Sequence, residues 1–462
     1  MTKPSLPPGT RDFSPEVVRK RNFILNTIRN VFEIYGYQPL ETPAMENLDT
    51  LLGKYGDEGD KLIFKILNNG LNDPKNAEKS RQAFEQVMQG RNDKGLTERA
   101  LKYDLTIPFA RWVAMNHAQL TLPFKRYQIQ PVWRADRPQK GRYREFTQCD
   151  ADVVGSRSMW NEVELAFIYH ESLTKLGIVG YELRINNRKI LAALAELCGG
   201  ADKMTDISIA IDKLDKIGLD KVKEELAVKG LSAAQIETVE KYLQISGDNN
   251  SQIKSAEALF GHSETGKQGI AELKQILEQS AKVSTSVPQL VIDFTLARGL
   301  NYYTGTIFEV KVKDLQMGSI GGGGRYDDLT GLFGVANIPG VGISFGVDRI
   351  YDVMEELNLF PASLQVSTQV LFFNLGEAES EAAFGLLQSL RGKGIIAEIY
   401  HEQAKFDKQF KYAEKKNIPF VVIIGSQELA NQTCTVKDLL KSEQVSMPFA
   451  TLASYFTQRR KA

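Results

Sequence analysis

The sequence predicts an α+β protein of several domains, with a sheet-containing core, a helical insertion and a compact α/β domain at the C-terminal end. A chain of 462 residues is longer than one hydrophobic core normally serves. Strand-like runs and helical periodicity are mixed in the first part, whereas the third hundred residues are rich in Leu, Ala, Lys and Glu at helical spacing. We expect domains at 1–189, 190–285, 286–360 and 366–462.

The composition is that of an ordinary globular protein, with 57 basic and 57 acidic side chains, so any nucleic-acid surface must be local. The cysteines Cys149, Cys198 and Cys434 are odd in number and far apart, which argues against a disulfide framework or structural zinc. No apolar stretch approaches the ~20 residues of a membrane span, and residues 1–12 lack the apolar core of a signal peptide. We therefore expect a cytoplasmic protein without a membrane segment.

One long amphipathic helix is predicted to begin after Ser14. Ser14 can cap the helix, and Pro15 suits its first turn, where a missing amide hydrogen costs nothing. Apolar side chains then recur at steps of three, four or seven until Gly36. The arm 37–43 contains two prolines, which favour an edge strand, and a helix with such an arm often serves an interface.

The segment 121–145 is predicted to form a charged hairpin, because it holds seven basic and two acidic residues between apolar runs. Arginines at its base would face an anion such as a nucleotide, and its tip would meet nucleic acid. Charge count alone leaves open a simpler interpretation, a solvated charged hairpin.

Other segments give weaker signals. We expect a loop or short helices at 68–95, a strand at 100–105, a helix after Pro108 and another at 161–176. Further strands are expected at 290–294, 304–312, 370–374 and 420–424, with helices at 350–357, 377–391 and 407–416. The run 261–267 imitates a phosphate-binding loop, but it lacks the required Ser or Thr and the preceding strand, so we treat it as chance.

Two glycine-rich stretches, 321–324 and 340–346, do not fit the dinucleotide-binding pattern of Gly-x-Gly-x-x-Gly between a strand and a helix. Glycine would let the backbone approach a flat or charged ligand, although tight turns in a barrel-like sheet would also explain it. Each stretch ends in an arginine beside a carboxylate, which favours the ligand-binding interpretation. These pairs are Arg325 with Asp327, and Asp348 with Arg349.

No nucleophile paired with a base is visible, and the four histidines are scattered singly, so none receives a role. An array rich in arginine suits phosphoryl or nucleotidyl transfer, in which alignment and charge stabilisation carry the rate. The polar residues that cluster with strand-like neighbours are Arg134, Arg142, Arg298, Arg349, Asp104, Gln148 and Asp152.

Several motifs resemble those of the histidyl-tRNA synthetases, which are class II aminoacyl-tRNA synthetases, and the resemblance covers nearly the whole chain. The most specific is Ala297-Arg298-Gly299-Leu300-Asn301-Tyr302-Tyr303-Thr304-Gly305, which is similar to the histidine-specific signature of that family. The other matching segments are 7–12, the helix and arm through Pro43 (motif 1), 101–106, 133–152 (motif 2) and 340–349 (motif 3).

The resemblance implies a class II antiparallel sheet core with helices, a helical insertion domain and a C-terminal α/β anticodon-binding domain. It implies ATP-dependent ligation of L-histidine to tRNA(His) through a histidyl-adenylate, for protein synthesis. The substrate ATP would come with Mg²⁺, without an organic cofactor or a metal site built from His or Cys. The first helix and arm would form a homodimer.

The resemblance also implies residue roles. Asp104, Thr106 and Gln148 would hold the α-ammonium of histidine; Asp152 and Tyr303 would meet the imidazole, with Tyr302 and Tyr326 also in the histidine pocket. Arg134 would bridge the α-phosphate and the amino-acid carboxylate, and Arg298 would stabilise charge at the α-phosphate; these two are the catalytic candidates. The remaining assignments are Arg142 and Arg349 on the triphosphate, Phe146 and Asp136 at adenine, and Arg137 and Gln139 on the tRNA acceptor end.

Two departures from the family pattern are present. Asn301 stands where the family usually has Asp, and Asp104 follows the eukaryote-like Tyr-Asp-Leu-Thr form instead of Pro-Glu-Gly-Thr. Two rival interpretations are a non-catalytic regulatory paralogue of histidine biosynthesis, and a class II synthetase for threonine, proline or glycine. The presence of Arg134, Arg349 and the whole C-terminal tail argues against the first, and the run 298–303 argues against the second.

Overall fold

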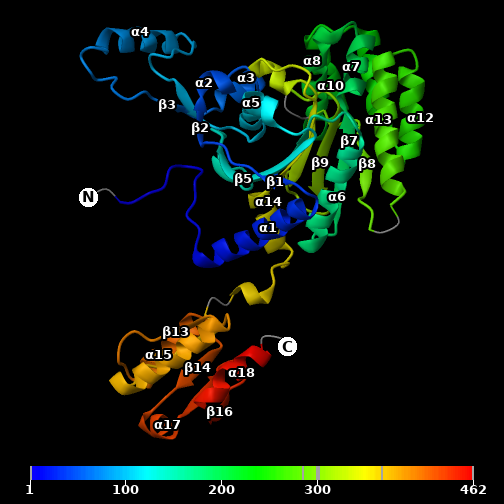
Figure 1. Cartoon of the computed structure of the whole chain (residues 1–462). Coiled ribbons are helices and arrows are strands. Elements are labelled where there is room, and N and C mark those ends of the chain that lie inside the picture. The colour runs from blue at the N-terminus through cyan, green and yellow to red at the C-terminus, as the bar shows by residue number, and fades with distance from the viewer. Residues whose placement is uncertain (1–2, 284–285, 298–301, 366–367, 460–462) are drawn as a thin grey trace. The chain divides into compact units, whose positions relative to one another are not determined.

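The computed structural model describes residues 3–283, 286–297, 302–365 and 368–459. The chain forms two compact units, Met1–Leu359 and Phe360–Ala462, and each is described by itself (Figure 1). None of the helices in the described ranges is long and apolar enough to cross a membrane.

An eight-stranded sheet forms the centre of the first unit, in the order β1-β5-β6-β11-β10-β9-β7-β8. All neighbours are antiparallel except the two edge pairs, β1 with β5 and β7 with β8, so the predicted antiparallel core is confirmed. The strands are β1 (Gln38–Pro39), β5 (Phe124–Trp133), β6 (Glu145–Val154), β7 (Tyr181–Asn187), β8 (Leu290–Ile292), β9 (Thr306–Val312), β10 (Gly321–Tyr326) and β11 (Gly340–Gly346).

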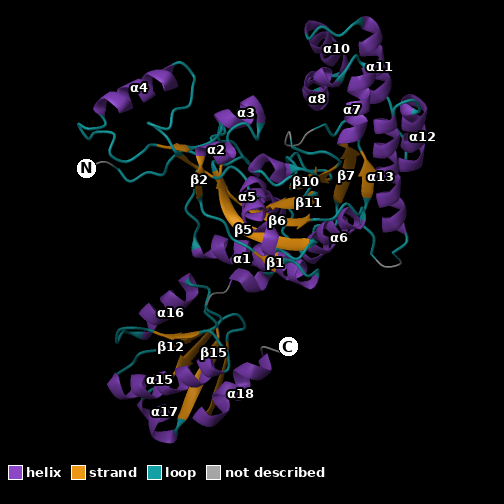
Figure 2. Ribbon diagram, turned by 45° about the horizontal axis from the view of Figure 1, so that its top comes forward, coloured by secondary structure: helices purple, strands orange, loops and turns teal. Residues whose placement is uncertain are grey.

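The first helix, α1 (Pro15–Ile34), begins and ends close to its predicted bounds. The Ser14 hydroxyl accepts a hydrogen bond from the Val17 amide at 3.4 Å, as an N-cap residue does. Ile24 and Ile28 on its inner face are fully buried. The helix packs against α6 (Trp160–Lys175) and α14 (Val347–Glu356), which lie along the central sheet (Figure 2).

The charged segment forms the predicted hairpin, whose two ten-residue strands β5 and β6 are paired along their full length. Because side chains alternate across a strand, every second residue faces the same side of the sheet. Gln148, Asp150 and Asp152 therefore share one face of β6. Their cross-strand partners on β5 are Gln130, Gln128 and Arg126.

A small three-stranded sheet, β2-β4-β3, lies beside the central sheet, and its surroundings differ from the prediction in three ways. Residues 68–95 contain one 12-residue helix, α4, instead of a loop or several short helices. The strand expected at 100–105 ends at Leu101, and α5 begins at Thr106, so Pro108 lies inside its first turn. The elements are β2 (Met45–Asn47), α2 (Leu48–Leu51), α3 (Gly56–Lys61), β3 (Lys65–Ile66), α4 (Ala77–Met88), β4 (Arg99–Leu101) and α5 (Thr106–Asn116).

A group of helices is inserted between β7 and β8, and Figure 2 shows it gathered at one end of the sheet. Its first helix starts directly after β7, because the Asn187 side chain caps the amide of Lys189 at 2.9 Å. The run that imitates a phosphate-binding loop, 261–267, covers the turn after α12 and the first residues of α13. The helices are α7 (Arg188–Leu197), α8 (Met204–Asp212), α9 (Leu214–Ile217), α10 (Leu219–Val228), α11 (Ala233–Leu243), α12 (Asn249–Phe260) and α13 (Glu264–Ala281).

The second unit is a five-stranded mixed sheet in the order β13-β12-β14-β15-β16, with helices packed on it. Its core includes fully buried Phe372, Leu387 and Val422. The elements are β12 (Val370–Phe372), α15 (Glu377–Gly392), β13 (Ala397–Ile399), α16 (Phe406–Lys415), β14 (Phe420–Ile423), α17 (Ser426–Asn431), β15 (Thr433–Asp438), β16 (Glu443–Pro448) and α18 (Phe449–Arg459).

A buried ion pair joins α6 to the central sheet. Arg325 on β10 donates from Nε and Nη2 to the two carboxylate oxygens of Glu162, at 2.6 and 2.7 Å. The two side chains are 2% and 0% exposed. Removing one member of such a pair leaves the other charge buried without compensation, which is strongly destabilising.

We therefore predict that Glu162→Ala lowers the free energy of unfolding of the first unit by about 3–5 kcal/mol. The measurement is urea unfolding followed by tryptophan fluorescence, since Trp112, Trp133 and Trp160 all lie in this unit. The control is Lys175→Ala, which removes a half-exposed ion pair with Glu171 on the same helix and should cost about 0–1 kcal/mol. Equal losses in the two variants would contradict the prediction.

Candidate functional site

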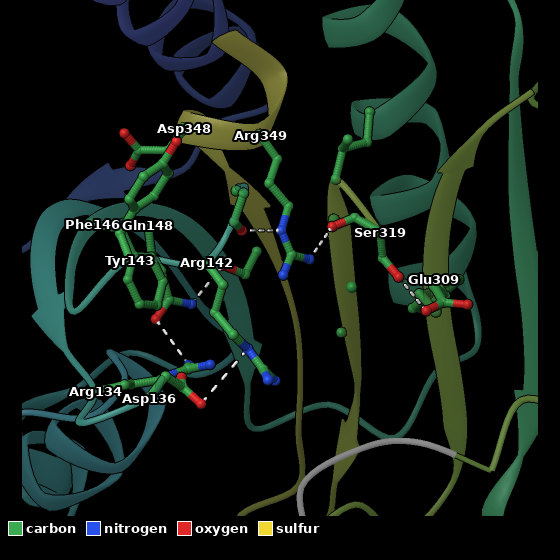
Figure 3. Close-up of a pocket in the computed structure, with 18 of the residues that line it drawn as sticks. Arg134, Asp136, Arg142, Tyr143, Phe146, Gln148, Glu309, Ser319, Asp348 and Arg349 are labelled. Carbon is green, nitrogen blue, oxygen red and sulfur yellow. Dashed lines mark hydrogen bonds and ion pairs between the residues drawn. The ribbon is translucent and has the colours of Figure 1, made fainter. Parts of the chain in front are cut away.

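A cavity of about 530 Å³ opens on the face of the central sheet that carries Gln148 (Figure 3). The hairpin loop forms one wall, strands β9 to β11 form the floor and the opposite wall, and the start of α14 closes one end. Its polar lining residues are Tyr103, Arg134, Asp136, Arg142, Tyr143, Gln148, Tyr303, Glu309, Ser319, Ser344, Asp348 and Arg349.

Three arginines predicted to bind ATP line this cavity together. Arg349 donates to the carbonyl oxygens of Gly141 and Ser319, at 2.9 and 2.6 Å. Burial, with the nearby cations Arg142 and Arg134, lowers the pKa of Arg349. Cations that repel one another at the wall of a cavity favour an anionic ligand between them.

Arg134 is held in a fixed orientation. Its Nε donates to the carbonyl oxygen of Tyr103 at 3.1 Å, and its Nη2 donates to Gln148 Oε1 at 3.4 Å. Its guanidinium carbon lies 4.3 Å from the centre of the Tyr103 ring and 5.1 Å from that of Phe146. A guanidinium fixed in this way before a ligand arrives needs little reorganisation to stabilise developing negative charge.

The side-chain amide of Gln148 is also oriented. Its Nε2 donates to Ser344 Oγ at 2.8 Å and to Asp150 Oδ1 at 3.4 Å. With the nitrogen directed to these acceptors, the oxygen is left on the side of Arg134. The oxygen is therefore placed to accept a hydrogen bond from a donor in the cavity.

Behind the cavity lies a buried carboxylate, Asp104, 2% exposed. It accepts hydrogen bonds from the hydroxyls of Tyr55 at 2.9 Å and Tyr302 at 3.1 Å, and from the Ile107 amide at 3.1 Å. Burial raises the pKa of Asp104, whereas these donors lower it.

Asp152, also 2% exposed, lies on β6 in the same region. The hydroxyl of Tyr326 donates to its Oδ1, and Arg126 Nη2 lies 2.8 Å from its Oδ2. Burial raises the pKa of Asp152, and Arg126 lowers it. Burial raises the pKa of the neighbouring Asp150 to about 7, although Arg126 opposes the rise.

Glycines on β11 make room for these side chains. A Cβ atom on Gly342 would lie 2.0 Å from Asp152 Oδ1, and one on Gly340 would lie 2.2 Å from the Tyr326 ring. At these positions glycine allows close packing of the protein on itself. Gly321, Gly322 and Gly323 on β10, and Gly346, line the cavity. A Cβ atom on Gly321 would lie 2.7 Å from the Tyr169 ring and one on Gly323 would lie 2.2 Å from the Gly342 carbonyl oxygen, so at these two positions too glycine allows close packing within the protein.

The structure brings together many of the predicted site residues. Arg134, Asp136, Arg142, Phe146, Gln148, Tyr303 and Arg349 line the cavity. Asp104, Asp152, Tyr302 and Tyr326 form the hydrogen-bonded layer behind it, and Thr106 is at the first position of α5. Arg137 and Gln139 are exposed at the tip of the hairpin loop. Arg298 and Asn301 lie outside the described residues.

Three basic residues do not face an anion as the sequence analysis proposed. Arg126 is 0% exposed and paired with Asp152, and Lys125 lies 2.6 Å from Glu164 on α6. Arg325 is buried against Glu162. Lys125 and Arg325 lie on the face of the sheet opposite to Gln148, whereas Arg126 lies on the same face as Gln148 but is fully buried against Asp152. A count of charges could not reveal this.

The carboxylate of Asp348 is also hydrogen-bonded to other residues of the protein. It accepts hydrogen bonds from Arg11, from Arg21 and from the Thr147 amide, the last at 3.2 Å. Asp348 therefore ties the N-terminal segment and α1 to the end of the cavity.

Sequence reasoning missed several polar residues of the site. Asp150 continues the alternation of Gln148 and Asp152 along β6, and this period of two could have indicated it. Nothing local indicated Glu309 on β9, which lines the wall opposite Arg134 and accepts a hydrogen bond from Ser319 (Figure 3). The described residues contain no cluster of three or more His, Cys, Asp or Glu suited to a metal ion.

Comparison with known proteins gives consistent matches. The sequence pattern of the Histidyl-tRNA synthetase family matches residues 71–350, and that of the Anticodon binding domain matches residues 369–459. Proteins named histidine–tRNA ligase from Christiangramia forsetii and Flavobacterium johnsoniae are 51% and 50% identical, each covering 98% of both chains. The crystal structure of histidyl-tRNA synthetase from Nostoc sp. matches with a TM-score of 0.82 at 32% identity, covering 100% of both chains.

The close approach of β11 to Asp152 gives a prediction. Gly342→Ala should lower the free energy of unfolding of the first unit by about 1–3 kcal/mol, because the new methyl group overlaps a buried carboxylate. The matched control on the same strand is Gly346→Ala, whose Cβ would meet its nearest neighbour at an ordinary 3.4 Å. Thermal melting followed by tryptophan fluorescence would test both, and a Gly346→Ala shift as large as that of Gly342→Ala would refute the packing argument.

Proposed function

The chain belongs to the histidyl-tRNA synthetase family, and we propose that it activates L-histidine with ATP and transfers the histidyl group to tRNA(His). It is thus a ligase of protein synthesis, a class II aminoacyl-tRNA synthetase that works through a histidyl-adenylate. The observation that carries the proposal is one cavity with arginines on its wall and oriented carboxylates directly behind it.

The carboxylate side would bind histidine. Asp104, Thr106 and Gln148 would hold the α-ammonium, since acceptor oxygens on three side chains suit the three N–H donors of an ammonium ion. Asp152, with Tyr303, would meet the imidazole. Tyr302 and Tyr326 would complete the pocket, and their hydroxyls hold Asp104 and Asp152 in place.

The arginine side would bind ATP. Arg142 and Arg349 would hold the triphosphate, while Phe146 and Asp136 would lie at the adenine. Arg134 would contact both the α-phosphate and the carboxylate of histidine, because it is hydrogen-bonded to Gln148 and lines the same cavity as Arg142 and Arg349. Arg298, in the signature, would add charge stabilisation at the α-phosphate.

ATP would be used with Mg²⁺, and the cavity fits this ion. Mg²⁺ in nucleotide sites is usually held by one or two carboxylates together with phosphate oxygens. Glu309 lines the wall opposite Arg134 and would be such a carboxylate (Figure 3). When bound, the ion would neutralise part of the phosphate charge.

The tRNA would be recognised at two places. Arg137 and Gln139, exposed at the hairpin tip, would contact the acceptor end of tRNA(His). The domain at 366–462 would bind the anticodon, which the family match over residues 369–459 supports. A regulatory paralogue would lack this domain. Residues 1–189 and 286–360 would form the catalytic core, and 190–285 its helical insertion.

A homodimer and a cytoplasmic location complete the proposal. Val18 and Ile34 on α1 are 40% and 68% exposed, and apolar side chains at the surface favour an interface through this helix and the following arm. The three cysteines are free and buried, as suits a reducing compartment.

The activity is tested by ATP–pyrophosphate exchange with each of the common amino acids. We expect exchange that depends on histidine alone, because only its side chain has a donor nitrogen and an acceptor nitrogen in one ring, and a pocket built for those hydrogen bonds rejects side chains that lack them. Charging of tRNA(His) with labelled histidine is the second readout. Exchange driven by another amino acid, or by none, would overturn the proposal.

A second prediction separates the two steps at the hairpin. Changing Arg137 and Gln139 together to Ala should slow histidyl transfer by about tenfold, as expected for losing one charge-assisted contact. Pyrophosphate exchange should change little, since neither side chain lines the cavity. The control is the same double change at Arg81 and Gln82, an exposed pair on α4. If both steps slowed equally, the hairpin tip would belong to the ATP site.

A further inference from the structure

Arg126 is a fully buried cation whose position is unusual for a residue of a charged hairpin. It lies on β5 with 0% exposure, directly opposite Asp152 on β6. Its Nη2 is 2.8 Å from Asp152 Oδ2, and its guanidinium carbon lies 4.3 Å from the centre of the Phe109 ring. A cation in this place must be compensated by its partner, because neither side chain is exposed to water.

The same guanidinium contacts a second part of the proposed histidine pocket. Its Nη2 donates to the carbonyl oxygen of Leu105 at 3.2 Å. Leu105 stands between Asp104 and Thr106, the residues proposed to hold the α-ammonium. Arg126 therefore connects the segment proposed for the ammonium with the carboxylate proposed for the imidazole.

Arg126 offsets the negative charge of the buried carboxylates around it. Asp104, Asp150 and Asp152 are each 2% exposed, and buried carboxylates near one another resist ionisation. Arg126 lowers the pKa of Asp150 and of Asp152, opposing the effect of burial. Among the described residues, the titratable or charged groups that interact with Asp152 are Arg126, Asp104, Asp150, Tyr37, Tyr303 and Tyr326.

We propose that Arg126 is a positioning residue of the histidine pocket, which keeps the Asp152 carboxylate ionised and oriented so that it accepts the N–H of the substrate imidazole. This inference rests on the proposed function. Arg126 itself is fully buried, with its guanidinium against Asp152, the Leu105 carbonyl and the Phe109 ring, and would not touch the substrate. It would act through Asp152, whose other oxygen is fixed by Tyr326.

The proposal differs from a purely structural role in its pH dependence. Without Arg126 the pKa of Asp152 would rise further, and a protonated carboxyl would no longer be the acceptor that the ring N–H needs. Histidine binding would then be weakest at low pH and would recover as the pH rises through the new pKa. A loss of packing alone would weaken binding equally at every pH.

The experiment measures the KM for histidine and for ATP in the full chain between about pH 6.5 and pH 8.5, by pyrophosphate exchange. At the low end of this pH range, Arg126→Met should raise the KM for histidine about tenfold relative to the unmodified chain. This is the effect expected if the pKa of Asp152 rises by about one unit. This ratio should fall towards the high end, and the KM for ATP should change little. Free histidine titrates in the same pH range, but this affects the variant and the unmodified chain equally. Dividing the KM of the variant by that of the unmodified chain at each pH therefore cancels the effect.

Two further variants and a control make the result decisive. Adding Asp150→Asn to Arg126→Met removes a like charge beside Asp152 and should restore part of the lost affinity. Arg126→Lys keeps the charge, folds more readily, and should show a smaller rise. The control Arg111→Met breaks an ion pair with Glu46 elsewhere in the unit and should leave the ratio unchanged.

The outcomes separate this inference from the proposed function. If the unmodified chain does not activate histidine, the proposed function fails. If it does, and Arg126→Met raises both KM values together or by a factor that is constant with pH, the proposed role of Arg126 is wrong. If Arg126→Met does not fold, a pH-independent ratio in Arg126→Lys and no gain from adding Asp150→Asn to it would overturn the proposal.

Discussion

The buried pair of Arg126 and Asp152 is the interaction on which the arrangement of the central sheet depends. Charged side chains in the middle of a sheet are tolerated only when each is paired and hydrogen-bonded. Tyr326 and the Leu105 carbonyl supply the additional hydrogen bonds, and Gly342 supplies the space. On the opposite face of β6, Cys149, Ala151 and Val153 are apolar and fully buried, so this part of the strand is amphipathic, with its polar face towards the cavity.

This polar face divides the site into two halves of opposite charge. Arg134, Arg142 and Arg349 surround the open part, where their mutual repulsion favours an anion. The carboxylates Asp104 and Asp152 lie behind it and favour ligand groups that donate hydrogen bonds. An amino acid has an ammonium at one side of its α-carbon and a carboxylate at the other, so it matches the boundary between the halves. Gln148 and Arg134, joined by a hydrogen bond, stand at that boundary.

Much of the fold and of the candidate site could be predicted from the sequence, because the local chemistry of the chain specified it. The start of α1 followed from Ser14 and Pro15, and the hairpin followed from its apolar flanks. Seven of the residues that line the cavity followed from motifs that resemble a known family: Arg134, Asp136, Arg142, Phe146, Gln148, Tyr303 and Arg349. Their assigned roles remain proposals, as does that of Arg298, which lies outside the described residues.

The errors arose where the tertiary structure decides which way a side chain points. Seven basic residues in one hairpin suggested an anion site, but Arg126 is buried because strand register places it opposite Asp152. Arg325 was similarly assigned to a ligand-facing pair, yet α6 brings Glu162 against it. Such contacts depend on which strands are adjacent, and a single sequence does not state this. Asp150 is a different case, because the alternation of Gln148 and Asp152 along β6 could have indicated it.

The central claim is that the Asp152 carboxylate, behind the arginine cavity, binds the imidazole of histidine. A crystal structure with L-histidine bound tests this claim most directly. We expect one imidazole nitrogen within about 2.7–3.2 Å of an oxygen of Asp152, with Arg126 still paired to that carboxylate. An imidazole bound elsewhere, with Asp152 in contact only with Tyr326 and Arg126, would contradict the account.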